Sequence, residues 1–365
     1  MSNEIIFLIS FVVFIGIILA LDLGLFHKKN QEVSMKEAGI MSFIMVAISL
    51  SFYFLITQFG HLIHNIDSIE KLQTVITKHH HPIKIIGDNL EQNIARYNNN
   101  LGMEFLTGYV VEYALSVDNI FVIMLIFTSF KVDKSNYQPV LFWGILGAIV
   151  MRFIFIFVGA ALIAKFGWIL YIFGAFLVYT GIKMYLERNK HEEIDIQHHP
   201  IVKLCNKYFK IHPHFVGEKF FVTVNNVKKI TPLLLVLIII EFTDLIFAVD
   251  SIPAIFSVTH DPYIVFFSNI FAIMGLRSMF FLLANVIDKL RFLKIGLAVL
   301  LVFIGAKMLA HHYLDEIGFE TGHSLLIIVF ILAVSIISSL LFPDKKHKDR
   351  KLHPKQDEIK NFPRH

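Results

Sequence analysis

The chain has 365 residues, of which 56% are hydrophobic and only 17% charged, and its formal net charge is +4. With a mean hydropathy of +0.65, this composition excludes an ordinary soluble domain and predicts a polytopic membrane protein. The single cysteine, Cys205, excludes a disulfide within the chain and a metal cluster held by thiolates. The first apolar run has no basic region before it and continues for about twenty residues, which predicts an uncleaved spanning helix rather than a signal peptide.

Nine apolar stretches are each close to the length of about twenty residues that a bilayer requires. The predicted fold class is therefore all-α, a polytopic bundle of transmembrane helices with about nine spans. The stretches lie at 5–26, 40–60, 105–130, 137–163, 165–186, 231–257, 263–284, 292–312 and 322–342.

Basic residues indicate the orientation of these spans, because Lys and Arg accumulate in cytoplasmic loops. If the N-terminus is placed outside, most of the 33 Lys and Arg residues fall in cytoplasmic connections. The pattern predicts a multi-pass protein of the inner or plasma membrane with a cytoplasmic C-terminus. The bilayer is thus an expected partner, and no nucleic acid partner is expected.

Two predicted helices in different halves of the chain carry the same acidic spacing. Glu112 and Asp118, in EYALSVDNI, stand six residues apart, as do Asp244 and Asp250 in EFTDLIFAVDSIP. Further matches follow in the same order, since the two helices after each acidic helix also come into register, which makes a repeating unit of three helices. They are Arg152 with Arg277, and GIKM at Gly181 to Met184 with GAKM at Gly305 to Met308.

A three-helix unit that is followed by its own copy must enter the membrane in the opposite direction, which is the inverted-topology repeat of many secondary transporters. We therefore expect a 3+3 inverted repeat with a substrate site near the midplane. The expected organisation is two N-terminal helices with a long polar outer loop (1–104), the first repeat (105–186), a cytoplasmic linker (187–230), the second repeat (231–312), a final transmembrane helix (313–342) and a basic cytoplasmic tail (343–365).

Carboxylates inside a membrane are costly and indicate a functional site. We expect Asp118 and Asp250 to be cation ligands, and Glu112 and Asp244 to be either further ligands or proton carriers. Such oxygen ligands suit magnesium, calcium or manganese. Two neighbouring residues, Asn119 and Ser251, would add neutral oxygens.

The alternative is purely structural, since a buried charge is tolerated when it is paired. In that case the acids would pair with Arg152, Arg277, Lys183 and Lys307, and the two lysines could also extend to the membrane surface. Asp22, near the end of the first span, marks a candidate entrance, and an interfacial carboxylate at a helix end is the equal alternative.

Helix geometry separates the members of each acidic pair. Residues six apart differ by about 240° around a helix and by about 9 Å along it, so Glu112 and Asp118 cannot share a face of a regular helix. Pro253 predicts a break in the second acidic helix, which would free the carbonyl of Val249 beside Asp250. Glu241 has no acidic counterpart in the first repeat and is placed at the edge of the site.

The outer loop contains His61, His64 and the run His79 to His81. A histidine run without a second spaced partner fixes no coordination geometry. We therefore expect a solvated, partly helical loop rather than a metal-gathering site.

With these motifs the sequence resembles the TerC family of integral membrane proteins, particularly its Alx-like branch. The matching pieces are ALDLGLFHKK, EYALSVDNIFV, EFTDLIFAVDSIPAI and MGLRSMFFLL, and the resemblance covers residues 5–340. It implies membership of the LysE-type transporter superfamily, manganese efflux as the activity and an association with tellurium resistance. It also implies that Glu112, Asp118, Asp244 and Asp250 lie on the metal pathway, whereas the histidine-bearing loop departs from the family's compact pattern.

The expected function is export of divalent metal cations, with manganese as substrate on the strength of the resemblance and protons as a candidate coupling ion. No resident cofactor and no enzymatic activity are expected. An intramembrane aspartyl protease is disfavoured because the Gly-x-Gly-Asp signature is missing. A non-transporting scaffold in metal or envelope stress is the retained alternative, and the oligomeric state is left open.

Overall fold

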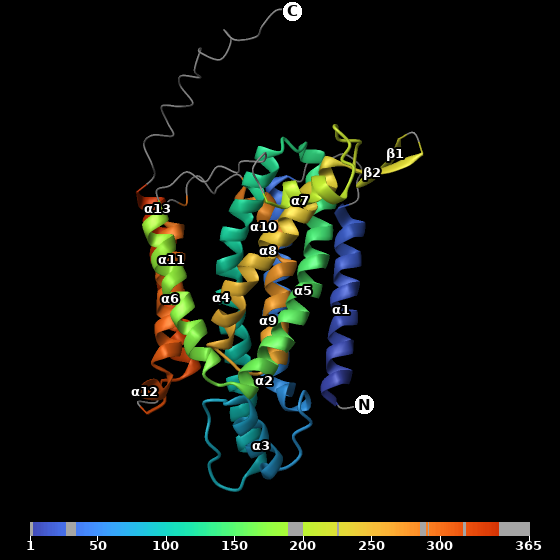
Figure 1. The fold of residues 1–365 in the computed structure, drawn as a ribbon. Helices are drawn as coiled ribbons and strands as arrows, with labels where there is room; N and C mark the ends of the chain where they lie inside the picture. Colours follow the sequence, from blue (N-terminus) through green and yellow to red (C-terminus); the bar gives the residue numbers. More distant parts are fainter. Residues whose placement is uncertain are drawn as a thin grey trace, which may run out of the picture.

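The computed structural model describes residues 3–26, 34–188, 200–224, 226–284, 290, 292–316 and 319–342. Long helices run side by side through most of the described chain (Figure 1), so the predicted all-α polytopic bundle is confirmed. The helices are α1 (Asn3–Phe26), α2 (Met35–Phe59), α3 (Ile69–His79), α4 (Leu90–Ser129), α5 (Tyr137–Lys165), α6 (Ile169–Glu187), α7 (Pro200–Tyr208), α8 (Pro232–Phe256), α9 (Pro262–Met274), α10 (Leu276–Leu283), α11 (Leu293–Leu309), α12 (His311–Glu316) and α13 (Thr321–Leu341).

A small antiparallel hairpin was not expected from the sequence. Its strands are β1 (Phe221–Val224) and β2 (Val227–Ile230), with Phe221 opposite Ile230 and Val224 opposite Val227. It lies in the segment between α7 and α8, at the end of the bundle opposite the N-terminus and α3 (Figure 1).

Seven helices in the described residues, α1, α2, α4, α5, α6, α8 and α13, are long and apolar enough to cross a membrane. The pair α9 and α10 passes the same test together as one bent span. The remaining expected span, 292–312, corresponds to α11, which has 17 residues. The predicted number of nine spans is therefore not confirmed.

The predicted outer loop is largely helical. We call residues 60–89 the cap, which contains α3 and the short 3-10 helix Gly60–Leu62. Beyond the cap, α4 begins at Leu90, where the Asn89 side chain accepts a hydrogen bond from the backbone N–H of Gln92. Because α4 has 40 residues, it is about 60 Å long and exceeds a hydrocarbon core of about 30 Å. Part of the helix therefore extends out of the membrane, and the start predicted at 105 lies inside the helix.

The interface between α6 and α11 is built from small residues that allow the two backbones to approach. A Cβ on Gly305 would lie 2.6 Å from the carbonyl oxygen of Gly174, and one on Gly181 would lie 2.7 Å from that of Ala298. In the predicted repeat Gly181 corresponds to Gly305, and Gly174 corresponds to Ala298. Each of the two contacts is therefore the counterpart of the other. The repeat itself stays a prediction.

The break in the second acidic helix is not found where the sequence predicted it. Helix α8 continues through Pro253 to Phe256, and membrane-spanning helices tolerate proline in this way. The bend occurs instead at Gly275, between α9 and α10, which meet at 40°.

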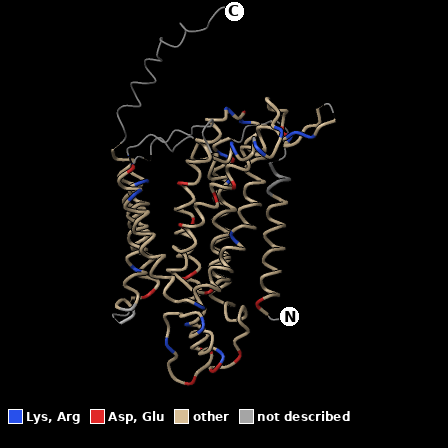
Figure 2. The backbone as a smooth tube through the Cα atoms, in the orientation of Figure 1, with Lys and Arg blue, Asp and Glu red and all other residues tan. Residues whose placement is uncertain are grey.

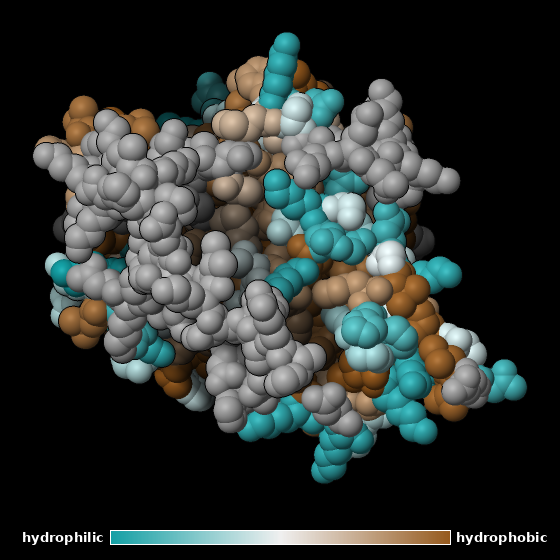
Figure 3. Space-filling view, turned by 90° about the horizontal axis from the view of Figure 1, so that it is seen from above, coloured by the Kyte–Doolittle hydropathy of each residue, from teal (hydrophilic) through white to brown (hydrophobic). Residues whose placement is uncertain are grey.

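The two ends of the bundle differ in charge. Lys and Arg residues gather around α7 and the β hairpin, while the opposite end carries the cap, with charges of both signs (Figure 2). Seen from the hairpin end, hydrophilic side chains lie among hydrophobic ones on the described surface (Figure 3).

Candidate functional site

A buried polar cluster lies between α4, α5, α8 and α9, and we call it the central cluster. At its middle is Arg152 on α5, which is completely buried. Its Nη1 donates to Glu112 Oε1 and, over 2.6 Å, to Asn269 Oδ1. Its Nη2 donates to Asp244 Oδ1 over 3.4 Å. One arginine thus joins an acid from each of the two predicted repeats.

Neutral oxygens complete the central cluster. Ser251 Oγ lies 3.4 Å from Arg152 Nη1, and Asn269 Nδ2 donates to Glu112 Oε2 over 3.3 Å. Glu112, Ser251 and Asn269 are all buried. Two carboxylates against one guanidinium leave a formal charge of −1, and oxygen donors of this kind are ligands for hard cations.

The other predicted ligands lie along the same two helices. Asp250 is half-buried, and its Oδ1 accepts a hydrogen bond from Thr180 on α6 over 3.3 Å. Asp118 is half-buried on α4, and Asn119 beside it is buried. No three His, Cys, Asp or Glu side chains in the described part of the chain are arranged to hold a metal ion, so the predicted acids do not form a ready-made coordination shell.

The predicted basic partners differ from one another. Arg277 is buried on α10, whereas Lys183 is exposed on α6. Lys307 donates to the carbonyl of Ser257, the C-cap of α8, over 3.0 Å. The side chain of Asp22, the candidate entrance, lies outside the described residues, as does the predicted tail 343–365.

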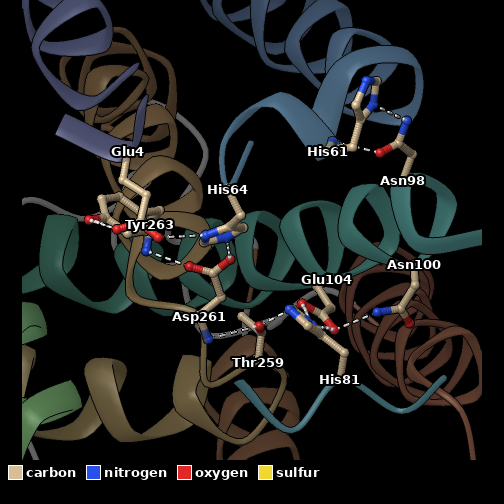
Figure 4. Close-up of polar contacts among 10 residues, drawn as sticks. All are labelled: Glu4, His61, His64, His81, Asn98, Asn100, Glu104, Thr259, Asp261 and Tyr263. Atoms are coloured by element: carbon tan, nitrogen blue, oxygen red, sulfur yellow. Dashed lines mark hydrogen bonds and ion pairs between the residues drawn. The ribbon is translucent and has the colours of Figure 1, made fainter. Parts of the chain in front are cut away.

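A second network joins the cap to the bundle (Figure 4). Its first half is centred on His64, whose Nδ1 lies 3.0 Å from Glu4 Oε1 on α1 and whose Nε2 lies 2.9 Å from Asp261 Oδ2. The hydroxyl of Tyr263 donates to Glu4 Oε2 over 3.2 Å. Because Asp261 is the N-cap of α9, His64 holds the cap against the α8–α9 connection.

The second half is centred on Glu104 of α4. Its carboxylate lies 2.8 Å from His81 Nδ1 and accepts hydrogen bonds of 2.6 Å from both Thr259 and Asn100. Glu104 and His81 are buried. The prediction of a solvated loop is therefore wrong for these histidines, because carboxylates from α4 and from the α8–α9 connection receive them inside the protein.

The pairing of histidines with carboxylates shifts the pKa values of both kinds of group. Burial lowers the pKa of His64, but Asp261 and Glu4 outweigh it and raise the value to about 9. Burial alone would raise the pKa of Asp261, yet His64 holds it well below its usual range. For His79 burial prevails and lowers the pKa, while for His81 the effect of Glu104 outweighs burial and raises it.

Raising the pH is expected to release the cap. The stabilisation from His64 is fully present below its ordinary pKa of 6.5 and is lost as the pH rises towards about 9. The difference between these two pKa values corresponds to about 3 kcal/mol. Amide hydrogen exchange in the cap, measured from pH 6 to 10 with a chelator present, should accelerate beyond intrinsic exchange across this window. A His64→Gln variant should be faster at pH 6 and lose the part of the transition that His64 contributes, and an identical profile in both proteins would contradict the assignment.

A cavity of about 1780 Å³ opens between the cap, the α5–α6 connection, the end of α8 and the end of α11. The cap lines it with His79 and His81, and the bundle with His260 and Lys307. Burial lowers the pKa of His260 to about 3, with His80 and His311 acting in the same direction. The His260 imidazole is therefore neutral at physiological pH.

Sequence reasoning missed Asn269, Asp261 and Glu104. Each interrupts or borders an apolar stretch: Asn269 follows Ser268 within α9, Asp261 precedes Pro262, and Glu104 precedes the predicted span at 105. A buried polar residue inside a spanning helix is a usable signal for Asn269. The partners of the other two depend on how the cap folds back.

The fold and the central cluster define a polytopic integral membrane protein with ionisable groups buried in its helix bundle. Residues 97–347 match the family described as integral membrane protein TerC family, and the chain belongs to that family.

Full-length relatives extend this match. The chain is 43% identical over 329 residues to the "Putative membrane-bound redox modulator Alx" of Photorhabdus laumondii, covering 90% of this chain and 92% of that protein. It is 40% identical over 332 residues to an uncharacterized membrane protein of Myxococcus xanthus, covering 91% of both chains. The protein of Escherichia coli K12 that carries the same name as the Photorhabdus protein is 40% identical over 332 residues, covering 88% of this chain and 92% of its own. No solved structure matches the chain.

Proposed function

We propose that this protein is a secondary transporter that exports divalent metal cations. The observation that carries the proposal is the central cluster, in which Glu112 and Asp244 meet around Arg152 inside the bundle. Unlike a simple ion pair, this arrangement has an excess carboxylate and two neutral oxygens at Ser251 and Asn269. An uncompensated negative charge at this depth costs free energy unless a cation binds beside it.

In the proposed cycle the guanidinium of Arg152 holds the carboxylates while no cation is bound. An arriving cation competes with Arg152 for Glu112 and Asp244, and Asp118 and Asp250 lie on its path along α4 and α8. Protons are the proposed coupling ion, carried on the carboxylates when the cation leaves. The choice of manganese among hard cations rests on the family resemblance, because oxygen ligands by themselves accept magnesium and calcium as well.

The proposed orientation places the hairpin end in the cytoplasm and the cap outside. The basic residues around α7 and the β hairpin (Figure 2) support this assignment, since such residues favour the cytoplasmic side. The proposed location is the inner or plasma membrane, and export then runs from the hairpin end towards the cap.

The name of the Alx relatives, membrane-bound redox modulator, refers to a redox role. The chain has one cysteine, so a disulfide within a single chain cannot form, and a single thiol offers no dithiol chemistry for such a role.

Reconstitution separates transport from the scaffold alternative. Purified protein in liposomes should move Mn²⁺ along a gradient if it is a transporter. It should leave the Mn²⁺ distribution unchanged if it is only a scaffold.

Removing a pathway carboxylate is expected to abolish protection against manganese. In a strain that lacks its own exporters, Asp118→Asn and Asp250→Asn should each reduce growth in excess manganese to that of the empty vector, with raised cell manganese. Asp67→Asn is the matched control, because Asp67 is an exposed carboxylate in the cap and its loss should change nothing. Full protection by either pathway variant at equal expression would disprove the proposed route.

A further inference from the structure

The run His79 to His81 folds so that its outer two members turn inwards. His79 ends α3, and His80 adopts a left-handed conformation with φ of 53°. The backbone N–H groups of His80 and His81 both bond to the carbonyl of Ile76, which reverses the chain. As a result His79 and His81 are each 5% exposed, whereas His80 is exposed and its ring lies 5.5 Å from that of His260.

Three buried polar atoms beside this turn have no hydrogen-bond partner among the described residues. They are His79 Nε2, His81 Nε2 and the hydroxyl oxygen of Tyr97. The ring of His81 neighbours both of the others, with centroid distances of 5.9 Å to His79 and 5.4 Å to Tyr97. Because buried polar groups normally find a partner in protein, ordered water or an ion, three such atoms on neighbouring rings mark a position suited to a bound ion or water.

The surroundings of His81 are those of a metal-binding imidazole. Its Nδ1 is held by Glu104, 2.8 Å away, and Glu104 is itself fixed by hydrogen bonds from Thr259 and Asn100. A carboxylate behind one ring nitrogen orients the imidazole and directs the other nitrogen to a metal. Two imidazoles that bind one tetrahedral ion through Nε2 have ring centroids about 5–6 Å apart, which agrees with the separation of His79 and His81.

We propose that His79 and His81 bind one divalent first-row transition-metal ion through their Nε2 atoms, on the cap side of the molecule. The Tyr97 hydroxyl and water supply the remaining ligands, since the described residues contain no third His, Cys, Asp or Glu side chain in ligating position. Binding displaces the proton from Nε2, so the site takes up metal and releases a proton. Imidazole ligands favour ions such as Mn²⁺, Fe²⁺, Co²⁺ and Zn²⁺ over Mg²⁺ and Ca²⁺.

This cap site is separate from the central cluster. Glu104 and Glu112 both belong to α4, and eight residues of helix separate them by about 12 Å along the axis. A metal ion in the cap site would join the end of α3 to α4, and through Thr259 to the connection between α8 and α9. The site does not depend on the transport proposal, because it uses none of the residues assigned to that pathway.

The test is metal binding by the purified full-length protein in detergent after treatment with a chelator. Titration with Co²⁺ should give visible absorption bands that saturate at one ion per chain and disappear when Zn²⁺ is added. Pulsed electron paramagnetic resonance of bound Mn²⁺ should show ¹⁴N coupling from imidazole. The bands should be unchanged in an Asp118→Asn/Asp250→Asn protein, in which the proposed pathway is disabled.

Variants of the histidine run give the matched comparison. His79→Ala and His81→Ala should each lose at least tenfold in Co²⁺ affinity, and Glu104→Gln should lose about 10–100-fold. His80→Ala should bind as the wild type does, because His80 is exposed and its ring lies beside His260. Melting in metal-free buffer shows which variants fold. Absence of the cobalt bands and of ¹⁴N coupling in the wild-type protein would overturn the proposal even if a variant failed to fold, as would unchanged affinity in folded His79→Ala and His81→Ala.

Discussion

Replacing Arg152 with methionine is expected to lower the free energy of unfolding by about 3–5 kcal/mol, the usual cost of removing one partner from a buried ion pair. Arg152 is fully buried, and its two Nη atoms are the groups that join Glu112 to Asp244. Without the guanidinium, two carboxylates face each other inside the bundle with no cation between them. SDS titration of the purified protein in mixed micelles measures this loss.

A double variant tests whether charge rather than shape causes the loss. Arg152→Met combined with Glu112→Gln should recover part of the stability, because the second change removes one of the uncompensated carboxylates. Lys165→Met, at the exposed end of α5, should remain close to wild type. If Arg152→Met alone were as stable as Lys165→Met, the ion pairs of the central cluster would not hold the bundle together.

The helices could be predicted from sequence because length and apolar composition are properties of one segment at a time. An apolar run of about twenty residues can satisfy its own backbone hydrogen bonds in a bilayer only as a helix, whichever helices pack against it. The burial of Arg152 beside carboxylates followed from the same reasoning, since an intramembrane charge requires a partner. That the partners are Glu112 and Asp244 together is a property of the packed bundle.

The cap could not be predicted in this way. Its histidines lie in a polar stretch with no membrane constraint, and their burial depends on Glu104 and Asp261, which are distant from them in sequence.

The position of the helix break could not be predicted from local propensity either. Pro253 is the stronger breaker by propensity, yet α8 continues past it and the bend falls at Gly275, because tertiary packing decides which helix is interrupted.

Gly305→Leu is expected to destabilise the bundle by about 3 kcal/mol, at the upper end of the cost of overpacking a well-packed interior. The clash is with backbone, since the new Cβ would lie 2.6 Å from the Gly174 carbonyl oxygen and 2.8 Å from the Val178 nitrogen. A side chain can rotate away from such a contact, but a helix backbone cannot, so α6 and α11 would have to separate. In a membrane this close packing is a main source of helix association.

A substitution at Gly16 separates the effect of the clash from the effect of adding an apolar side chain. A Cβ on Gly16 of α1 would meet nothing within 4 Å, so Gly16→Leu adds the same apolar side chain without a clash and should leave stability unchanged in the SDS titration. Gly174→Leu should resemble Gly305→Leu, and the double variant should lose less than the sum of the two, because the first substitution has already separated the helices. Additive losses would mean that the two glycines do not share one contact, and the close approach of α6 and α11 at this point would then be wrong.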